Sequence, residues 1–477
     1  MSAVVDSRVG SSAAAPTAAS PLDAPRSRRE PTWWRDAVGC ATWASLLVVV
    51  ALWVHGAGLQ ALTGWGPGLT SLGRLTGLLA SNLLLMQVLL MARIPMVERT
   101  FGQDELARRH RLVGFWSFTL MVGHVLLIVL GYALEASTNP LAELWTVVVD
   151  DPGMLLAAAA SLLLVLVVVT SIRAARRRLR YESWHLLHLY AYLGVGLALP
   201  HQLWTGQEFL SSRVATVYWW SLWIVAAGAV LGWRVLVPLY RTLTHRLRVV
   251  AVVPESDKVV SIVMQGRRLE RLPAQAGQFF TWRFLDGPGA TRGHPYSLSA
   301  PPDGDRLRIT VKALGDGSGG LAQVRPGTRV AIEGPYGRLH EGVRTHRKVL
   351  LMGSGVGVTP LRGLLESMSQ EPGDVTLIYR AHSSADLILK AEIDAVAAQR
   401  GARVRYAVGP RIPGRHSWLP ESAAHLTDAD ALRHLVPDVA DHDVYLCGAV
   451  AWMSAARAAA TEAGVPSHAI HEERFSW

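Results

Sequence analysis

The chain has 477 residues, of which 50% are hydrophobic and 18% are charged, and this balance argues against a purely soluble protein. The formal net charge is +10, but arginines in the loops between apolar segments account for much of it, so we expect no nucleic-acid partner. The two cysteines, Cys40 and Cys447, lie in different halves of the chain, which excludes a disulfide framework.

The apolar residues are concentrated before about residue 242. The first residues are rich in Ala, Ser and Pro without the apolar core of a signal peptide, so we expect a disordered cytoplasmic tail over 1–36. A membrane-spanning helix needs ~20 apolar residues. Six runs meet this need and predict a six-helix transmembrane bundle over 37–242: 37–55, 72–93, 110–133, 152–173, 184–203 and 214–240.

The charges between these runs predict an orientation. Arginines cluster before the first run, between the second and third, and between the fourth and fifth, whereas the loop at 134–151 is acidic. Because arginine and lysine favour the cytoplasmic side, we expect a multi-pass protein of the cell (inner) membrane, in contact with lipid, with its N-terminus and C-terminal half in the cytoplasm.

Two predicted spans carry histidines at matched depths. His110 and His124 are 14 residues apart, about 21 Å along a helix, and His188 and His201 are 13 residues apart, about 19.5 Å. His110 and His188 then share the inner level, and His124 and His201 the outer one. Thirteen residues turn His201 by ~140° from the face of His188, but Pro200 can distort the helix and re-aim it.

Facing neutral imidazoles are what a six-coordinate haem iron needs, so these four histidines predict two stacked haems. The alternative for any single histidine is a hydrogen bond to a neighbouring helix, which is equally common. Four histidines at matched depths favour ligation.

After residue 242 short apolar runs alternate with Gly, Pro and charged residues, as in a soluble region. The alternation in 246–266 and 276–285 predicts a small antiparallel β-barrel. The stretch "HPYSLSAPP" offers a ring and hydroxyls for an isoalloxazine edge, and the glycine-rich turn "VKALGDGSGGL" suits a pyrophosphate. The candidate residues are His294, Pro295, Tyr296, Ser297, Lys312, Gly315, Ser318 and Gly319.

The segment "KVLLMGSGVGVTPLRGLLESM" predicts a buried strand over 348–352, a glycine turn and an amphipathic helix, a join that binds phosphate. Its candidate residues are Gly353, Gly355, Gly357, Thr359 and Pro360. Arg380 is expected just beyond a later strand, where a guanidinium can grip a 2′-phosphate and favour NADPH over NADH. Cys447 and Gly448 lie at the end of another predicted strand, at the edge where α/β sheets bind ligands.

Together, the histidine pairs, "HPYSLSAPP", "GDGSGG", "GPYG", "GSGVGVTP", "YRA", "LCG" and the terminal "HEERFSW" resemble the NADPH oxidase and ferric reductase superfamily. The resemblance covers nearly everything after the tail. It implies a multi-domain membrane protein: a six-helix transmembrane domain with two b-type haems, an FAD-binding antiparallel β-barrel over 243–343, and an NADPH-binding α/β nucleotide-binding domain over 344–477.

The resemblance also implies roles for single residues. The H-P-Y-S stretch binds FAD, the glycine turn binds the NADPH pyrophosphate, Arg380 contacts the 2′-phosphate, and Cys447 with Gly448 lies near the nicotinamide. Family members often end in an aromatic residue that stacks on the flavin. Phe475 fits that motif, but the chain continues to Trp477, so both rings are candidates.

The implied activity is electron transfer from cytoplasmic NADPH through FAD and two haems to an extracytoplasmic acceptor. Dioxygen, giving superoxide, is the first choice because the predicted external loops are short and show no Cys/His/Met-rich cluster. A ferric chelate is close behind. Two further classes stay open: a module that serves a separate extracytoplasmic protein or quinone, and a flavin reductase anchored by haem-free helices, which the paired histidines disfavour.

Overall fold

The computed structural model describes residues 33–474 apart from 177, 180, 211 and 287–291. This part of the chain forms two compact units that divide between Val235 and Leu236. Each unit is described by itself below.

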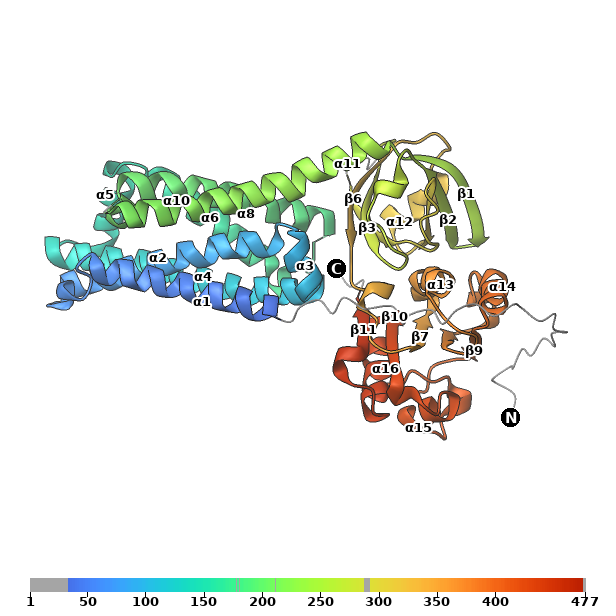
Figure 1. The fold of residues 1–477 in the computed structure, drawn as a ribbon. Helices are drawn as coiled ribbons and strands as arrows, with labels where there is room; N and C mark the ends of the chain where they lie inside the picture. Colours follow the sequence, from blue (N-terminus) through green and yellow to red (C-terminus); the bar gives the residue numbers. More distant parts are fainter. Residues whose placement is uncertain (1–32, 177, 180, 211, 287–291, 475–477) are drawn as a thin grey trace. The chain divides into compact units, whose positions relative to one another are not determined.

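The first unit consists of helices. Its long helices run side by side in a bundle, as Figure 1 shows. The elements are α1 (Trp33–His55), α2 (Trp65–Met91), α3 (Pro95–Phe101), α4 (Gln103–Ala136), α5 (Pro140–Asp150), α6 (Met154–Ser171), α7 (Arg173–Arg176), α8 (Tyr181–Trp204), α9 (Gln207–Leu210) and α10 (Arg213–Ala229), with a 3₁₀ turn at Gln60–Leu62.

Several of these helices are transmembrane in length and composition. Among the described residues, five helical segments are long and apolar enough to cross a membrane: α1, α2, α4, α6 and the continuous segment Arg213–His245. That last segment joins α10, a π-helical stretch (Val230–Leu236) and α11 (Val237–His245). The predicted fifth span, 184–203, falls in α8, a 24-residue helix outside this set. The predicted count of six therefore stays a prediction.

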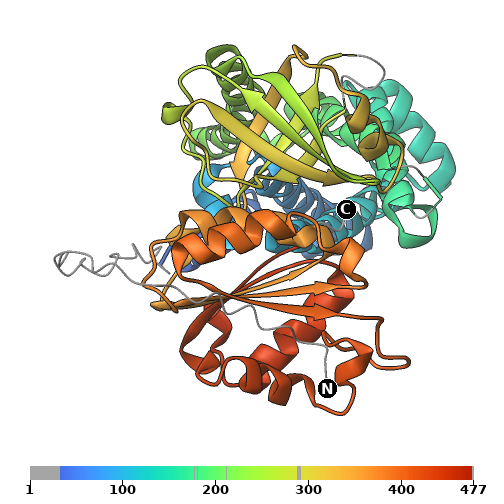
Figure 2. The ribbon, with the colours of Figure 1, turned by 90° about the vertical axis from the view of Figure 1, so that its right-hand side faces the viewer.

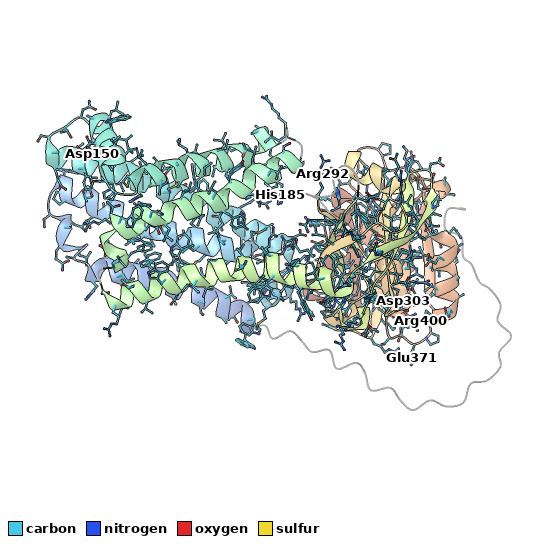
Figure 3. All side chains as sticks on the ribbon, turned by 90° about the horizontal axis from the view of Figure 1, so that it is seen from above. Asp150, His185, Arg292, Asp303, Glu371 and Arg400 are labelled. Atoms are coloured by element: carbon cyan, nitrogen blue, oxygen red, sulfur yellow. The ribbon has the colours of Figure 1, made fainter. Side chains whose placement is uncertain are left out.

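Local sequence explains where α5 and α10 begin. The Asn139 side chain accepts a hydrogen bond from the Leu141 N–H and Pro140 opens α5, while the Ser212 hydroxyl accepts from the Ala215 N–H before α10. Asp150 at the end of α5 and His185 near the start of α8 lie at opposite ends of the bundle (Figure 3). One end of the bundle thus lies near the end of α5 and the other near the start of α8.

The second unit begins with two three-stranded antiparallel sheets. One has the order β1-β2-β5, from β1 (Arg248–Ser256), β2 (Val259–Gln265) and β5 (Arg306–Lys312). The other has the order β4-β3-β6, from β4 (His294–Ser297), β3 (Phe279–Phe284) and β6 (Val330–Tyr336). Isolated bridges Arg248–Arg329 and Leu298–Ile309 connect the two sheets. Alternate residues of both sheets enclose one apolar core that includes Ile262, Trp282 and Ile309.

The rest of this unit is a five-stranded parallel sheet of order β11-β10-β7-β8-β9. Its strands are β7 (Lys348–Ser354), β8 (Val375–Ala381), β9 (Arg403–Val408), β10 (His442–Cys447) and β11 (Ile470–Glu473), and its helices are α13 (Val358–Ser367), α14 (Lys390–Arg400), α15 (Asp428–Leu435) and α16 (Val450–Glu462). Helices cover both faces of the sheet (Figure 2), which explains why the central strands read as continuous apolar runs.

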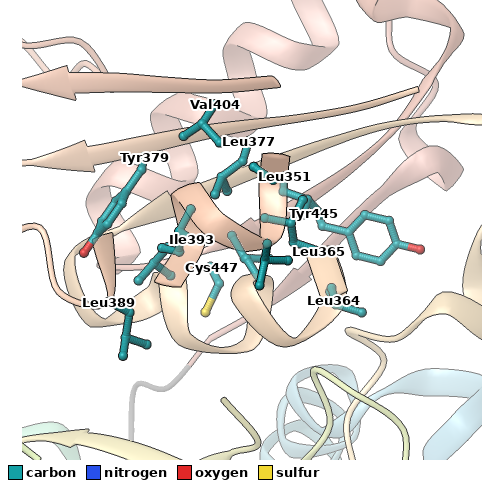
Figure 4. Close-up of a cluster of buried hydrophobic side chains, with 14 of the residues drawn as sticks. Leu351, Leu364, Leu365, Leu377, Tyr379, Leu389, Ile393, Val404, Tyr445 and Cys447 are labelled. Atoms are coloured by element: carbon teal, nitrogen blue, oxygen red, sulfur yellow. The ribbon is translucent and has the colours of Figure 1, made fainter. Parts of the chain in front are cut away.

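Two apolar clusters fill the spaces on either side of this sheet. α13 and α14 close one cluster, which contains Leu351, Leu377, Ile393 and Cys447 (Figure 4). α15 and α16 close the other, around Leu350, Trp418 and Met453. Because helices cover both faces of this sheet, a ligand is expected at the carboxyl-terminal edge of its strands.

Candidate functional site

The inner histidine pair comes together between α4 and α8. The ring centroids of His110 and His188 lie 5.9 Å apart with their planes at 61°. Nδ1 of His110 lies 3.3 Å from the Gln87 carbonyl oxygen and Nδ1 of His188 lies 3.3 Å from the Ser171 hydroxyl. The Gln87 amide nitrogen lies 3.5 Å from Nε2 of His110. Two imidazoles from different helices thus face one another, as the sequence predicted for this level.

The outer pair is formed by His124 of α4 and His201 of α8, which lie close enough for their charges to interact. Nδ1 of His124 donates to the Gly73 carbonyl oxygen at 2.8 Å. Nδ1 of His201 is buried and has no hydrogen-bond partner among the residues that the structure describes. Pro200 lies inside α8, directly before His201.

These surroundings fit histidines that bind a haem iron. A carbonyl oxygen only accepts, so the neutral rings of His110 and His124 carry their proton on Nδ1 and keep a lone pair on Nε2, the nitrogen that would bind a metal. In His110 the Gln87 side-chain amide lies within hydrogen-bond reach of that nitrogen, so a bound iron would take the place of this donor. Metal-ligating histidines usually hold their second nitrogen in this way. The donor set, two imidazoles at each of two levels, is that of a six-coordinate haem.

The predicted flavin-binding residues His294, Pro295, Tyr296 and Ser297 form β4. The Trp282 indole donates to the Tyr296 carbonyl oxygen at 2.9 Å, and burial raises the pKa of the Tyr296 phenol to about 12, so it stays a neutral donor. The buried Ser297 hydroxyl has no hydrogen-bond partner within the described chain. A buried hydroxyl without a partner is costly, and a flavin that accepts its hydrogen bond removes that cost.

The glycine-rich turn after Lys312 is open. Cβ atoms placed at Gly315 and Gly319 meet nothing within 4 Å. The Ser318 hydroxyl oxygen accepts from the backbone N–H groups of Leu314 and Gly315, at 2.9 and 3.2 Å. Ser318 therefore shapes the turn, whose exposed backbone is what an anion needs.

A polar network ties the flavin-binding segment to the nucleotide half of the same unit. The Ser299 carbonyl oxygen accepts from Arg308 at 2.9 Å and from Arg362 of α13 at 3.3 Å. Glu392 of α14 pairs with both arginines. Because α13 directly follows the glycine turn, these contacts fix the distance between the two predicted cofactor segments.

The glycine turn itself differs slightly from the expectation. The strand continues to Ser354 instead of ending at 352, so Gly353 lies in β7, and Gly355–Gly357 form a 3₁₀ turn before α13. Gly355 has φ +56° and open space around it. The Thr359 hydroxyl donates to the Val356 carbonyl oxygen at 2.9 Å, and Pro360 is buried in the first turn of α13. The helix N-terminus with an open glycine before it fits a phosphate.

Cys447 ends β10, as predicted, beside Gly353 of β7 and Glu473 of β11. A Cβ at Gly357 would lie 2.3 Å from the Cys447 carbonyl oxygen, and one at Gly448 would lie 2.8 Å from the Ser354 Cβ. The structure therefore brings Gly353, Gly357, Cys447 and Gly448 together at one sheet edge. Burial, followed by the charge of Glu473, raises the pKa of the Cys447 thiol, which stays protonated at neutral pH.

Glu473 is a residue that sequence reasoning passed over. Its carboxylate is buried, and a Cβ at Gly337, in the "GPYG" turn of the barrel, would lie 2.5 Å from its Oε2. It thus lies between that turn and Cys447. The only available signal was its place in "HEERFSW", of which Phe475 and Trp477 lie outside the described residues.

Arg380 lies one residue before the end of β8 rather than beyond it, and its side chain is buried. Its guanidinium donates to the carbonyl oxygens of Ala381, Ala407 and Pro410. The expectation that Arg380 lies just beyond the strand was therefore wrong. The contacts hold the group in one orientation at the carboxyl edge of the sheet.

Two family models match this chain. "Ferric reductase like transmembrane component" matches residues 76–199, and "Oxidoreductase NAD-binding domain" matches residues 351–458. The first includes His110, His124 and His188 and ends before His201. The second includes the glycine turn, Arg380 and Cys447.

Curated relatives match the second half. Ferredoxin–NADP reductase B of Sorangium cellulosum is 30% identical over 244 residues, which cover 48% of this chain and 96% of that protein. The ferredoxin reductase component of 3-ketosteroid-9-alpha-monooxygenase of Mycobacterium tuberculosis is 30% identical over 245 residues, 48% of this chain and 64% of that protein.

Among solved structures, a flavohemoglobin from Malassezia yamatoensis with bound FAD and heme has a TM-score of 0.41 and 18% identity, covering 83% of this chain and 99% of that one.

The family assignment rests on the two models and on the Sorangium relative. The chain belongs to the NADPH oxidase and ferric reductase superfamily, in which a ferric-reductase-like transmembrane domain is joined to a ferredoxin-reductase-like FAD/NAD module.

Proposed function

We propose that this oxidoreductase takes electrons from cytoplasmic NADPH and delivers them across the cell membrane to an extracytoplasmic acceptor, with dioxygen, giving superoxide, as the first choice. The observation that carries the proposal is that α4 and α8 pair His110 with His188 and His124 with His201. At 1.5 Å per residue, the spacing of 14 and 13 residues corresponds to ~20 Å between the two pairs. A single pair near one surface would not connect the two sides.

Each cofactor has its own set of residues in this proposal. The two histidine pairs hold two b-type haems, β4 and the turn at Gly315–Gly319 hold FAD, and the turn at Gly353–Gly357 with Thr359, Pro360 and Gly448 holds NADPH. The flavin and haems supply the exchange between a two-electron donor and one-electron acceptors. The protein sets distances, binds phosphates and keeps the Cys447 thiol neutral beside the nicotinamide.

The architecture we propose has six spans, with α8 as the fifth, and a closed six-stranded barrel. The bridges Arg248–Arg329 and Leu298–Ile309 support closure because they join both edges of one sheet to the other. The domain limits we propose are 37–242, 243–343 and 344–477. The arginine-rich loops support an N-terminus and a dehydrogenase half on the cytoplasmic side.

The acceptor is tested by one anaerobic experiment. The purified, FAD-supplemented protein is reduced with NADPH and then mixed with oxygenated buffer or with ferric chelate. Rapid haem reoxidation by oxygen, with superoxide detected, is the expected result. Rapid reoxidation by the chelate alone would make the protein a ferric reductase. Slow reoxidation by both, accelerated by extracytoplasmic extract, would make it a module for a separate partner.

Arg380→Leu is expected to raise KM for NADPH about tenfold or more and to leave KM for NADH within about twofold, because the part of the nucleotide that the guanidinium would bind is the 2′-phosphate, which NADH lacks. Three carbonyl contacts already orient this group at the sheet edge. Steady-state reduction of the flavin with each nucleotide checks the prediction. Equal losses with both nucleotides would assign Arg380 to strand packing alone.

Gly153→Ala is expected to weaken the outer haem site. Gly153 has φ +81°, and a Cβ there would lie 3.0 Å from the backbone nitrogen of His201 and 2.9 Å from the Trp204 ring. An L side chain at this φ costs ~1–2 kcal/mol, which corresponds to about a tenfold loss of haem affinity if it is relieved by moving His201. Haem content and the visible spectrum measure the effect, and an unchanged spectrum with two haems bound would contradict it.

A further inference from the structure

α2 and α4 run antiparallel and pack closely, because at successive levels one of the two helices has a glycine opposite a side chain of the other. A Cβ at Gly131 would lie 2.3 Å from the Thr70 hydroxyl oxygen, one at Gly73 would lie 2.9 Å from the Ile128 side chain, and one at Gly77 would lie 2.5 Å from Nδ1 of His124. At each level one helix lacks a side chain where the other presents one. The two helices can therefore approach to backbone contact.

The third of these levels differs from the other two because its partner is a histidine. Nδ1 of His124 donates to the Gly73 carbonyl oxygen at 2.8 Å, and Gly77 lies one turn further along α2, against the same nitrogen. The Thr76 hydroxyl donates to that same carbonyl oxygen, at 2.9 Å, and shares its proton with the Leu72 carbonyl oxygen at 3.1 Å. One backbone carbonyl thus orients the imidazole through a hydrogen bond, and the missing side chain of Gly77 leaves the room that the ring occupies.

We infer that α2 is the positioning element for His124: the Gly73 carbonyl fixes its proton on Nδ1, and Gly77 leaves room for the ring, so that Nε2 would be available, with its lone pair, to bind an outer haem iron. This inference rests on the proposed function, in which His124 is a haem ligand. A histidine with a fixed tautomer and orientation is a better metal ligand, and loss of such support typically costs ~10–100-fold in metal affinity.

The decisive variant is Gly77→Ala, with Gly123→Ala as its matched control. Both replace one glycine inside a long helix, so both gain the same helix propensity. The Cβ at position 123 meets nothing within 4 Å, although it directly precedes His124. We expect Gly77→Ala to lose one haem or to change the spectrum and midpoint potential of one haem, and Gly123→Ala to keep both haems with unchanged spectra.

Gly131→Ala separates ligand positioning from helix packing. It creates a contact at least as tight, 2.3 Å from the Thr70 hydroxyl oxygen, in the same helix pair but away from the histidine. It is expected to lower thermal stability without altering the haem spectra. If Gly131→Ala changes the haem as much as Gly77→Ala does, or if Gly77→Ala matches Gly123→Ala, the inference is wrong.

Thr76→Val provides a test that does not depend on the folding of Gly77→Ala. It keeps the size of the side chain and removes a competing donor from the Gly73 carbonyl, so the bond from His124 strengthens. A stronger N–H donation makes the imidazole a more basic ligand, and the midpoint potential of one haem is expected to fall. An unchanged potential would overturn the inference, whereas two haems in His124→Leu would refute the proposed function first.

Discussion

Replacing His124 by leucine is expected to lower the haem content from about two to about one per chain, because an iron with one remaining imidazole is held far more weakly. In this variant the Gly73 carbonyl keeps the Thr76 hydroxyl as a donor. The inner haem should still be reduced by NADPH. Electron delivery to the external acceptor should fall by about 100-fold or more, since the path then ends inside the membrane.

His185→Leu is the matched control. His185 lies near the start of α8, one turn before His188, and is outside both pairs. It should keep two haems and nearly full activity. Haem quantified against protein, together with stopped-flow reduction, distinguishes the variants. Two haems in His124→Leu would remove His124 as a ligand, and loss of both would indicate that the bundle rather than one site had failed.

Much of the architecture followed from sequence periodicity. Uncharged runs of membrane length became helices of the first unit, and the run 348–352 became the core of β7. Cys447 could be placed at a strand end because Gly448 interrupts the apolar run there. Local patterns sufficed wherever burial alone decides the element.

Side-chain partners across elements could not be predicted in this way. Arg380 is buried by three carbonyl contacts, two of which come from the end of β9 and the loop after it, and these become neighbours only once the sheet has formed. Glu473 meets Cys447 through parallel strand pairing, which no local pattern encodes. Nothing in the local sequence distinguishes Gly77 from other helical glycines, because its contact with His124 depends on how α2 packs against α4.

The same reasoning about missing side chains gives the largest effect in the nucleotide half. Gly357→Ala is expected to raise KM for NADPH about tenfold or more and to slow flavin reduction, while FAD stays bound. The new Cβ would lie 2.3 Å from the Cys447 carbonyl oxygen and 2.7 Å from the Gly448 Cα, both backbone atoms that cannot rotate away. Relief requires the start of α13 to move, at a cost of ~1–3 kcal/mol, and with it the N–H groups that face the phosphate.

Gly363→Ala in the same helix is the control for this effect. Its Cβ would have nearest neighbours at 3.5 Å, the Ala300 nitrogen and the Leu298 oxygen, which is ordinary contact. It gains helix propensity without moving the turn and should keep the KM for NADPH within about twofold. Rapid mixing with NADPH and a thermal melt of each variant separate binding from folding. A normal KM in a stable Gly357→Ala protein would show that the glycine turn does not hold the nucleotide.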